Sequence, residues 1–255
     1  MTRTIRQTIE SEGDWRGGRR ARLRFHAGGE EIPAILLLPE GTGPHPAALL
    51  LHGYSSRKEH MADGVGSALL RHGIASLAID LPLHGTRADP VQAQAARNPL
   101  AALRLWRQAV FEASLGLRYL AARREIDGRC LAVAGYSMGS YLAVMLAAEE
   151  PSVRAVVLAA GGDLPGGTPL AAIARTVVDP LRAVRRLAGR PLLMVHGRND
   201  RTVRPEQAER LFAAAGEPKE LRWWPSGHIL PPPAVDDAAA WLAERLEGGR
   251  RTAAG

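Results

Sequence analysis

The 255-residue chain contains a single cysteine, Cys130, and can therefore form no internal disulfide. One free thiol is typical of a protein from a reducing compartment. The chain has no apolar run approaching the roughly 18 residues that span a membrane. Residues 1–18, MTRTIRQTIESEGDWRGG, are charged throughout and lack the apolar stretch of a secretory signal. We therefore expect a cytoplasmic protein with no membrane partner.

Lysine and aromatic residues are also scarce. The formal net charge is +7, yet the only lysines are Lys58 and Lys219, and aromatic residues make up 5% of the chain. Arginines therefore carry almost all the positive charge. They are scattered, without the interleaved aromatic side chains of many nucleic-acid sites. We interpret the excess charge as a solvated arginine-rich surface and predict no nucleic-acid partner.

The sequence has no recognisable ligand pattern for a metal ion or a nucleotide. No histidine or cysteine pair has the spacing of metal ligands, and no glycine-rich phosphate loop opens a predicted helix. We predict an activity that needs neither a metal nor a cofactor.

The chain does contain a regular alternation of short apolar runs and helical stretches. The apolar runs predict eight strands, over residues 21–27, 31–39, 46–53, 74–80, 129–137, 154–162, 191–197 and 219–225. The stretches between them predict six helices, over residues 61–73, 99–124, 139–150, 169–188, 204–216 and 233–248. This alternation is typical of an α/β fold with a mostly parallel sheet and helices on both faces, here with an antiparallel N-terminal edge.

We predict a single domain over residues 1–248, in which residues 1–18 form an N-terminal extension. Residues 21–27 alternate arginine with apolar side chains, as an exposed edge strand would. The chain ends in GGRRTAAG (248–255), and we predict that residues 249–255 are a disordered tail.

The segment VAGYSMGSY (133–141) stands between a predicted strand and a predicted helix. Gly135 and Gly139 weaken both elements, by up to about 1 kcal/mol each relative to alanine. Their spacing around Ser137 forms the pattern G-x-S-x-G, in which a serine occupies a strained turn and projects its hydroxyl away from the backbone. The helix N-terminus behind this serine adds partial positive charge where an oxyanion would develop. Ser137 is therefore the candidate nucleophile.

A nucleophilic serine needs a base that accepts its proton and an acid that orients the base. Asp200 follows the seventh predicted strand, and His228 follows the eighth. The order serine, acid, histidine, with each residue on a loop after a strand, places all three at one edge of a parallel sheet. We predict that Ser137, Asp200 and His228 form a catalytic triad. Asp163, after the sixth strand, is the alternative acid.

With these motifs the chain resembles the α/β-hydrolase superfamily, and within it the small serine esterases and the dienelactone-hydrolase-like or peptidase-like members. The resemblance covers residues 21–248 and rests further on the segments LHGYSSRKE (51–59), IDLPLHGTR (79–87), HGRNDRTV (196–203) and SGH (226–228). It implies that the backbone N–H groups of Tyr54 and Met138 form an oxyanion hole.

The resemblance also implies a carboxylesterase that hydrolyses small-molecule esters through an acyl-enzyme on Ser137. The same triad would serve a peptidase, a thioesterase or a lactone hydrolase, and these alternatives stay open. A further alternative is a catalytically inactive binding protein of the same fold. A monomer and a homodimer are both compatible with the sequence.

The substrate pocket is expected to be small. Only residues 163–190 separate the sixth and seventh predicted strands, where capped relatives carry a large insertion, so we expect a minimal cap. Residues 86–99 are a candidate flap beside the site. The candidate pocket walls are Tyr54, Met138, Leu164 and Ile229. A shallow, weakly capped pocket predicts short acyl chains, from acetyl to butyryl.

Overall fold

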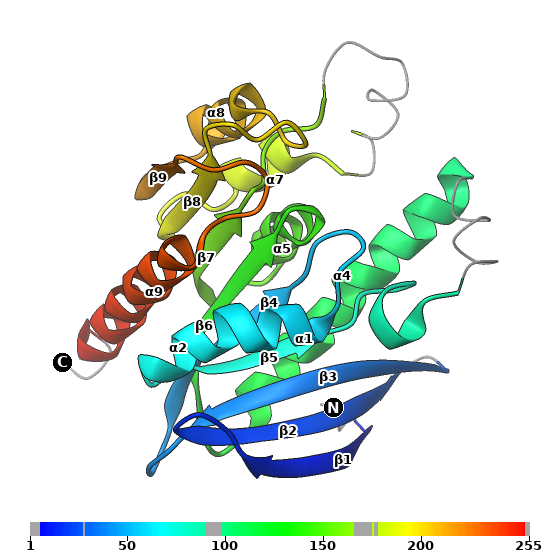
Figure 1. Cartoon of the computed structure of the whole chain (residues 1–255), viewed down its shortest axis with the longest axis vertical. Coiled ribbons are helices and arrows are strands. Elements are labelled where there is room, and N and C mark those ends of the chain that lie inside the picture. The colour runs from blue at the N-terminus through cyan, green and yellow to red at the C-terminus, as the bar shows by residue number, and fades with distance from the viewer. Residues whose placement is uncertain (1–5, 28, 90–97, 166–174, 176–177, 253–255) are drawn as a thin grey trace.

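The computed structural model describes residues 6–27, 29–89, 98–165, 175 and 178–252. Nine strands form one sheet in the order β1-β2-β3-β5-β4-β6-β7-β8-β9 (Figure 1). In chain order the strands are β1 (Arg6–Asp14), β2 (Gly18–Ala27), β3 (Glu30–Pro39), β4 (His45–Leu51), β5 (Ala75–Ile79), β6 (Ile126–Tyr136), β7 (Val153–Ala159), β8 (Leu192–Gly197) and β9 (Lys219–Trp224).

The sheet is antiparallel at its N-terminal end and parallel elsewhere. Strands β1, β2 and β3 pair antiparallel, as do β3 and β5, and every pair from β5 across to β9 is parallel. The predicted α/β fold with a mostly parallel sheet and an antiparallel N-terminal edge is confirmed.

The described part of the chain forms nine strands, one more than the predicted eight. Strand β1 lies within the predicted extension 1–18 and forms the edge of the sheet. Residues 21–27, predicted to be an edge strand, lie in β2, which pairs with β1 on one side and with β3 on the other. Every residue of β1 is exposed, so its sequence lacks the alternation of apolar and polar residues that marks a half-buried strand. Backbone pairing with β2 and ion pairs hold it instead, among them Arg19 with Glu12 at 3.0 Å and Arg24 with Glu10.

Helices cover both faces of the sheet. The helical segments are α1 (Lys58–Met61), the π-helical turn η1 (Ala62–Gly66), α2 (Ser67–Arg71), the 3-10 turn η2 (Gly85–Arg87), α4 (Pro99–Ala122), α5 (Met138–Glu149), α7 (Pro180–Arg185), α8 (Pro205–Ala214) and α9 (Pro232–Thr252). Helices α4, α5, α7 and α8 contribute to one core cluster, and α1, α2 and α9 to the other (Figure 1).

Alternating side chains of the central strands fill these two cores. In β4, Leu49 and Leu51 pack in the first cluster, whereas Leu50 packs in the second. Successive side chains of a strand point to opposite faces, so a strand that is buried on both faces reads as a continuous apolar run. This is why the run at residues 46–53 was recognisable as a central strand.

The C-terminal boundary differs from prediction, and two other predicted segments are only partly described. Helix α9 continues to Thr252, so residues 249–252 of the predicted disordered tail are helical. Of the helix predicted over 169–188, the structure describes α7 and Arg175, while 166–174 and 176–177 lie outside the described residues. The candidate flap 86–99 likewise falls mostly outside them, at 90–97. No helix among those described is long and apolar enough to cross a membrane.

Candidate active site

Ser137 occupies the tight turn between β6 and α5. Its backbone has φ 50° and ψ −115°, a conformation that residues other than glycine rarely adopt. A Cβ on Gly135 would lie 2.1 Å from the Gly139 carbonyl oxygen, and a Cβ on Gly139 would lie 2.1 Å from the Leu51 carbonyl oxygen. The two glycines therefore let helix α5 approach β4 and β6 closely enough to form the turn.

The structure brings the three predicted triad residues together. The Ser137 Oγ lies 2.9 Å from Nε2 of His228, and Nδ1 of His228 lies 2.8 Å from Oδ2 of Asp200. A carboxylate only accepts hydrogen bonds, so Nδ1 of His228 carries a proton and donates it to Asp200. The Nε2 atom is then free to accept the hydroxyl proton of Ser137. Three side chains from the ends of β6, β8 and β9 thus form one hydrogen-bonded chain.

Asp200 is held in place by its own loop. Its side chain is fully buried, and its Oδ1 accepts hydrogen bonds from the backbone N–H groups of Thr202, at 2.8 Å, and Val203, at 3.0 Å. Nε2 of the buried His196 donates to the Val203 carbonyl at 2.9 Å and lies 3.6 Å from Oδ2 of Asp200. The loop therefore directs Oδ2 toward His228.

Asp163, the alternative acid, has other partners. Its Oδ1 accepts from the backbone N–H of Leu164 at 2.8 Å, and its Oδ2 pairs with Arg175 at 2.7 Å and with Arg210 at 3.1 Å. Burial alone would raise the pKa of Asp163, but the hydrogen bonds from the two guanidinium groups lower it below its ordinary value. Both carboxylate oxygens are engaged by these partners, so Asp200 and not Asp163 contacts His228.

Tyr136 supports the histidine loop, a role that the sequence did not indicate. Its hydroxyl donates to the His228 carbonyl at 2.6 Å and accepts from the Leu230 N–H at 3.0 Å. The rings of Tyr136 and His228 also meet edge to face, with centroids 6.0 Å apart. Tyr136 occupies the first unspecified position of the pattern G-x-S-x-G, and its hydrogen-bond partners lie more than ninety positions away in the sequence. No local signal therefore marks it.

Of the two predicted oxyanion-hole residues, Met138 follows Ser137 directly, and Tyr54 follows Gly53, where an added Cβ would lie 3.2 Å from the Ser137 Cβ. Met138 is the first residue of α5, where backbone N–H groups are free of helical partners, and Tyr54 lies in the turn that follows β4. His52 fixes that turn, since its Nδ1 donates to the Gly53 carbonyl at 2.8 Å and its Nε2 accepts from the Leu81 N–H at 3.1 Å. Burial lowers the pKa of His52 from 6.5 to about 4, so the ring is neutral.

A buried ion pair connects the same turn to the loop after β5. Lys58 Nζ lies 2.8 Å from Oδ2 of Asp80, and Oδ1 of Asp80 accepts from the Lys58 backbone N–H at 2.9 Å. The backbone N–H of Thr86 also donates to Asp80, at 3.1 Å. Every oxygen of this buried carboxylate therefore has partners, as a buried charge requires. The pair positions the two loops that border the site and does not contact His228.

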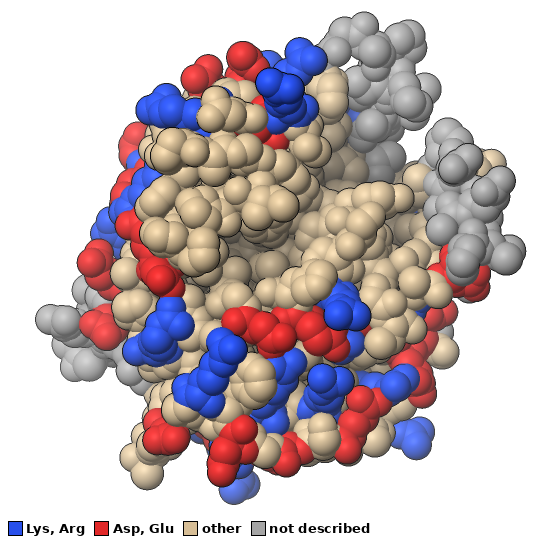
Figure 2. Space-filling model, in the orientation of Figure 1, with Lys and Arg blue, Asp and Glu red and all other residues tan. Residues whose placement is uncertain are grey.

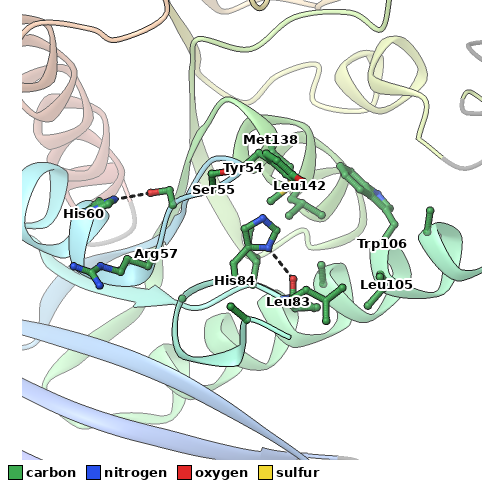
Figure 3. A pocket seen from close by; sticks show the side chains of 17 residues that line it. Tyr54, Ser55, Arg57, His60, Leu83, His84, Leu105, Trp106, Met138 and Leu142 are labelled. Carbon is green, nitrogen blue, oxygen red and sulfur yellow. Dashed lines mark hydrogen bonds between the residues drawn. The ribbon is translucent and has the colours of Figure 1, made fainter. Parts of the chain in front are cut away.

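A cavity of about 650 Å³ opens at Met138, the residue that follows Ser137 in the chain (Figure 3). Tyr54 and Met138 line it, as predicted pocket walls. Its apolar lining comes mainly from Leu81, Leu83, Leu105, Trp106, Met138 and Leu142, and its polar lining includes Arg57, His60 and His84. Figure 3 shows His84 between the loop of Arg57 and the helix of Trp106. Figure 2 shows a hollowed, uncharged centre on this face, with charged side chains gathered over β1 to β3.

Two of the predicted pocket walls do not line this cavity. Leu164 and Ile229 are absent from its described lining, and Ile229 is 83% exposed. Both follow strand ends near the triad, which is why the sequence suggested them. Their backbone position at the same sheet edge does not turn their side chains toward the cavity.

A family model described as the dienelactone hydrolase family matches residues 32–230. The chain belongs to this family. The predicted resemblance to the α/β-hydrolase superfamily, and to its dienelactone-hydrolase-like members, is therefore confirmed, and membership makes the chain a hydrolase. Among the described residues, no group of three or more metal-binding side chains accompanies the site.

Esterases are among the relatives and structural neighbours of this family member. Esterase YjfP of Escherichia coli K12 is 25% identical over 248 residues, which cover 85% of this chain and 96% of the relative. Acetyl xylan esterase from Paenibacillus sp. R4 has a TM-score of 0.77 at 17% identity, covering 95% of this chain and 90% of that one. A cold-adapted esterase from an Arctic intertidal metagenomic library has a TM-score of 0.73 at 22% identity, covering 92% and 97%. The two solved structures support the fold.

Proposed function

We propose that this protein is a serine esterase that cleaves carboxylic esters through an acyl-enzyme on Ser137. The observation that carries the proposal is the continuous hydrogen-bonded chain from Ser137 through His228 to Asp200, with contacts of 2.9 and 2.8 Å. These lengths lie within the range for proton transfer between a nucleophile and its base.

Each residue then has a defined task. His228 accepts the Ser137 proton as the oxygen attacks the ester carbonyl, and Asp200 stabilises the resulting imidazolium. The backbone N–H groups of Tyr54 and Met138 bind the tetrahedral oxyanion, helped by the N-terminus of α5. His228 next protonates the departing alcohol. A water molecule then attacks the acyl-enzyme, with His228 again as the base.

Esters are the favoured substrates among the reactions that this triad would support. A peptidase, a thioesterase and a lactone hydrolase use the same arrangement, so the geometry alone does not separate them. The relative YjfP is named an esterase and aligns over most of both chains, which favours ester cleavage here. An inactive binding protein is disfavoured, because all three triad positions are filled and mutually hydrogen-bonded.

The length of the acyl chain is a separate question. The prediction of acetyl to butyryl esters depended on a shallow pocket, and a cavity of about 650 Å³ gives that prediction no support. Drug-sized ligands occupy pockets of about 300–1,000 Å³. A series of p-nitrophenyl esters from acetate to palmitate measures the preference directly. The predicted cytoplasmic location and the oligomeric state stay predictions.

The experiment that tests the proposed function replaces the nucleophile. Ser137→Ala is expected to lower kcat for p-nitrophenyl acetate by about 10⁴-fold or more and to abolish labelling by a fluorophosphonate probe. Ser226→Ala is the matched control, because Ser226 lies two residues before His228 and its hydroxyl donates a long hydrogen bond of 3.5 Å to the Gly227 carbonyl, outside the Ser137–His228–Asp200 chain. If the Ser137→Ala protein hydrolysed the ester as fast as the wild type, the proposal would be wrong.

A further inference from the structure

We infer that the cavity beside Ser137 binds the acyl group of the substrate, while the alcohol group leaves on the open side of His228. This inference rests on the proposed function and adds the side of the ester that the enzyme selects. It predicts an esterase for apolar acyl groups of about six carbons or more, with little selection for the alcohol.

The cavity and the histidine belong to different loops of the site. The described lining residues come from the turn after β4, helix α1, the loop after β5, helix α4 and the first turns of α5. No described lining residue belongs to the loops that carry Asp200 and His228. Beside His228, the neighbouring residue Ile229 is 83% exposed.

The chemistry of the tetrahedral intermediate assigns the two sides. The attacked carbon carries the Ser137 oxygen, the oxyanion, the leaving-group oxygen and the acyl carbon. His228 must protonate the leaving-group oxygen, so this oxygen lies within about 3 Å of Nε2. The oxyanion lies at the N–H groups of Tyr54 and Met138. The acyl carbon takes the remaining direction, away from Nε2 of His228, and Tyr54 and Met138 themselves border the cavity.

The lining determines which acyl groups fit. Leu105, Trp106 and Leu142 present apolar surface, and the volume of about 650 Å³ far exceeds an acetyl group. Burial of each additional methylene contributes enough free energy for roughly a fourfold gain in kcat/KM. Longer or bulkier apolar acyl groups therefore increase kcat/KM until the cavity is filled. An acetyl group leaves this surface uncovered.

Two isomeric esters test the direction of binding. Ethyl hexanoate and hexyl acetate have the same atoms, but the six-carbon chain is on the acyl side in one and on the alcohol side in the other. We expect the wild-type protein to show a kcat/KM at least about tenfold higher for ethyl hexanoate, measured by titration of the released acid. A preference for hexyl acetate, or equal rates for the two isomers, would overturn the inference.

A cavity-filling variant tests the location. Ala102 lines the cavity and is exposed, so Ala102→Trp places a large side chain there without displacing the core. We expect it to lower kcat/KM for ethyl hexanoate about tenfold more than kcat/KM for ethyl acetate. Ala122→Trp is the control, because Ala122 is an exposed alanine at the far end of the same helix, about 30 Å away. Equal losses for both esters in Ala102→Trp would contradict the assignment.

The result separates this inference from the proposed function. Hydrolysis that requires Ser137 but favours hexyl acetate overturns the acyl assignment and leaves the serine esterase standing. Absence of hydrolysis for every ester, together with absence of fluorophosphonate labelling, overturns the proposed function and the inference with it.

Leu105→Ala provides an independent measurement, because it widens the cavity and is expected to move the optimum toward longer acyl chains.

Discussion

Replacing each candidate acid by its amide distinguishes Asp200 from Asp163 as the partner of His228. In Asp200→Asn, the amide oxygen keeps the hydrogen bonds from the Thr202 and Val203 N–H groups, which hold Oδ1 at 2.8 and 3.0 Å. The amide nitrogen then occupies the position of Oδ2, 2.8 Å from Nδ1 of His228. Because this nitrogen is a donor, Nδ1 must become an acceptor, and the proton of the neutral ring moves to Nε2.

The size of the effect follows from this change of tautomer. A protonated Nε2 cannot accept the Ser137 proton, so the base is lost although the backbone is unchanged. A wrong histidine tautomer lowers kcat by about 10⁴-fold in a serine protease, equivalent to about 5 kcal/mol of transition-state stabilisation. Asp163→Asn instead weakens the pairing with Arg175 and Arg210. Both arginines are partly exposed, so we expect a loss of only about 1–2 kcal/mol in unfolding free energy and a kcat within threefold of wild type.

The assay is hydrolysis of p-nitrophenyl acetate by both purified variants, with thermal unfolding to verify that each is folded. The expected pattern is a nearly inactive, folded Asp200→Asn protein and an active, slightly less stable Asp163→Asn protein. The reverse pattern, with full activity in Asp200→Asn, would refute the assignment of the acid and the tautomer argument together.

Two further predictions concern the surroundings of the triad. Tyr136→Phe removes the hydroxyl that bridges the His228 carbonyl and the Leu230 N–H. We expect kcat and the rate of fluorophosphonate labelling to fall in parallel by about tenfold, with KM within twofold. Unchanged labelling kinetics would exclude a positioning role. Burial lowers the pKa of His52 from 6.5 to about 4, so between these pH values the unfolded chain binds more protons than the folded protein. The contribution of the neutral His52 ring to the unfolding free energy is therefore complete above pH 6.5 and is lost as the pH falls toward 4. Urea unfolding is expected to show that the wild type loses about 2 kcal/mol more than His52→Gln between pH 7 and pH 5; identical losses would contradict the buried neutral ring.

The sequence by itself determined the elements of the sheet and the position of the nucleophile. Doubly buried strands such as β4 read as continuous apolar runs, and Gly135 and Gly139 mark the turn around Ser137 because no side chain fits there. These signals are local, since burial on both faces and steric exclusion act on a few neighbouring residues. Asp200 and His228 were also recognisable, because each directly follows a strand whose end lies at the same sheet edge.

Only the tertiary structure decided which acid contacts His228, what supports the histidine loop and where the cavity lies. Asp163 and Asp200 both follow parallel strands, so position along the chain does not separate them; the guanidinium groups of Arg175 and Arg210 engage one, and His228 meets the other. Strand β1 was missed because exposed strands bury no apolar face, and Tyr136 because its partners are distant in sequence. Contacts between segments far apart in the chain depend on how whole elements pack, and the residue pattern of one segment does not encode them.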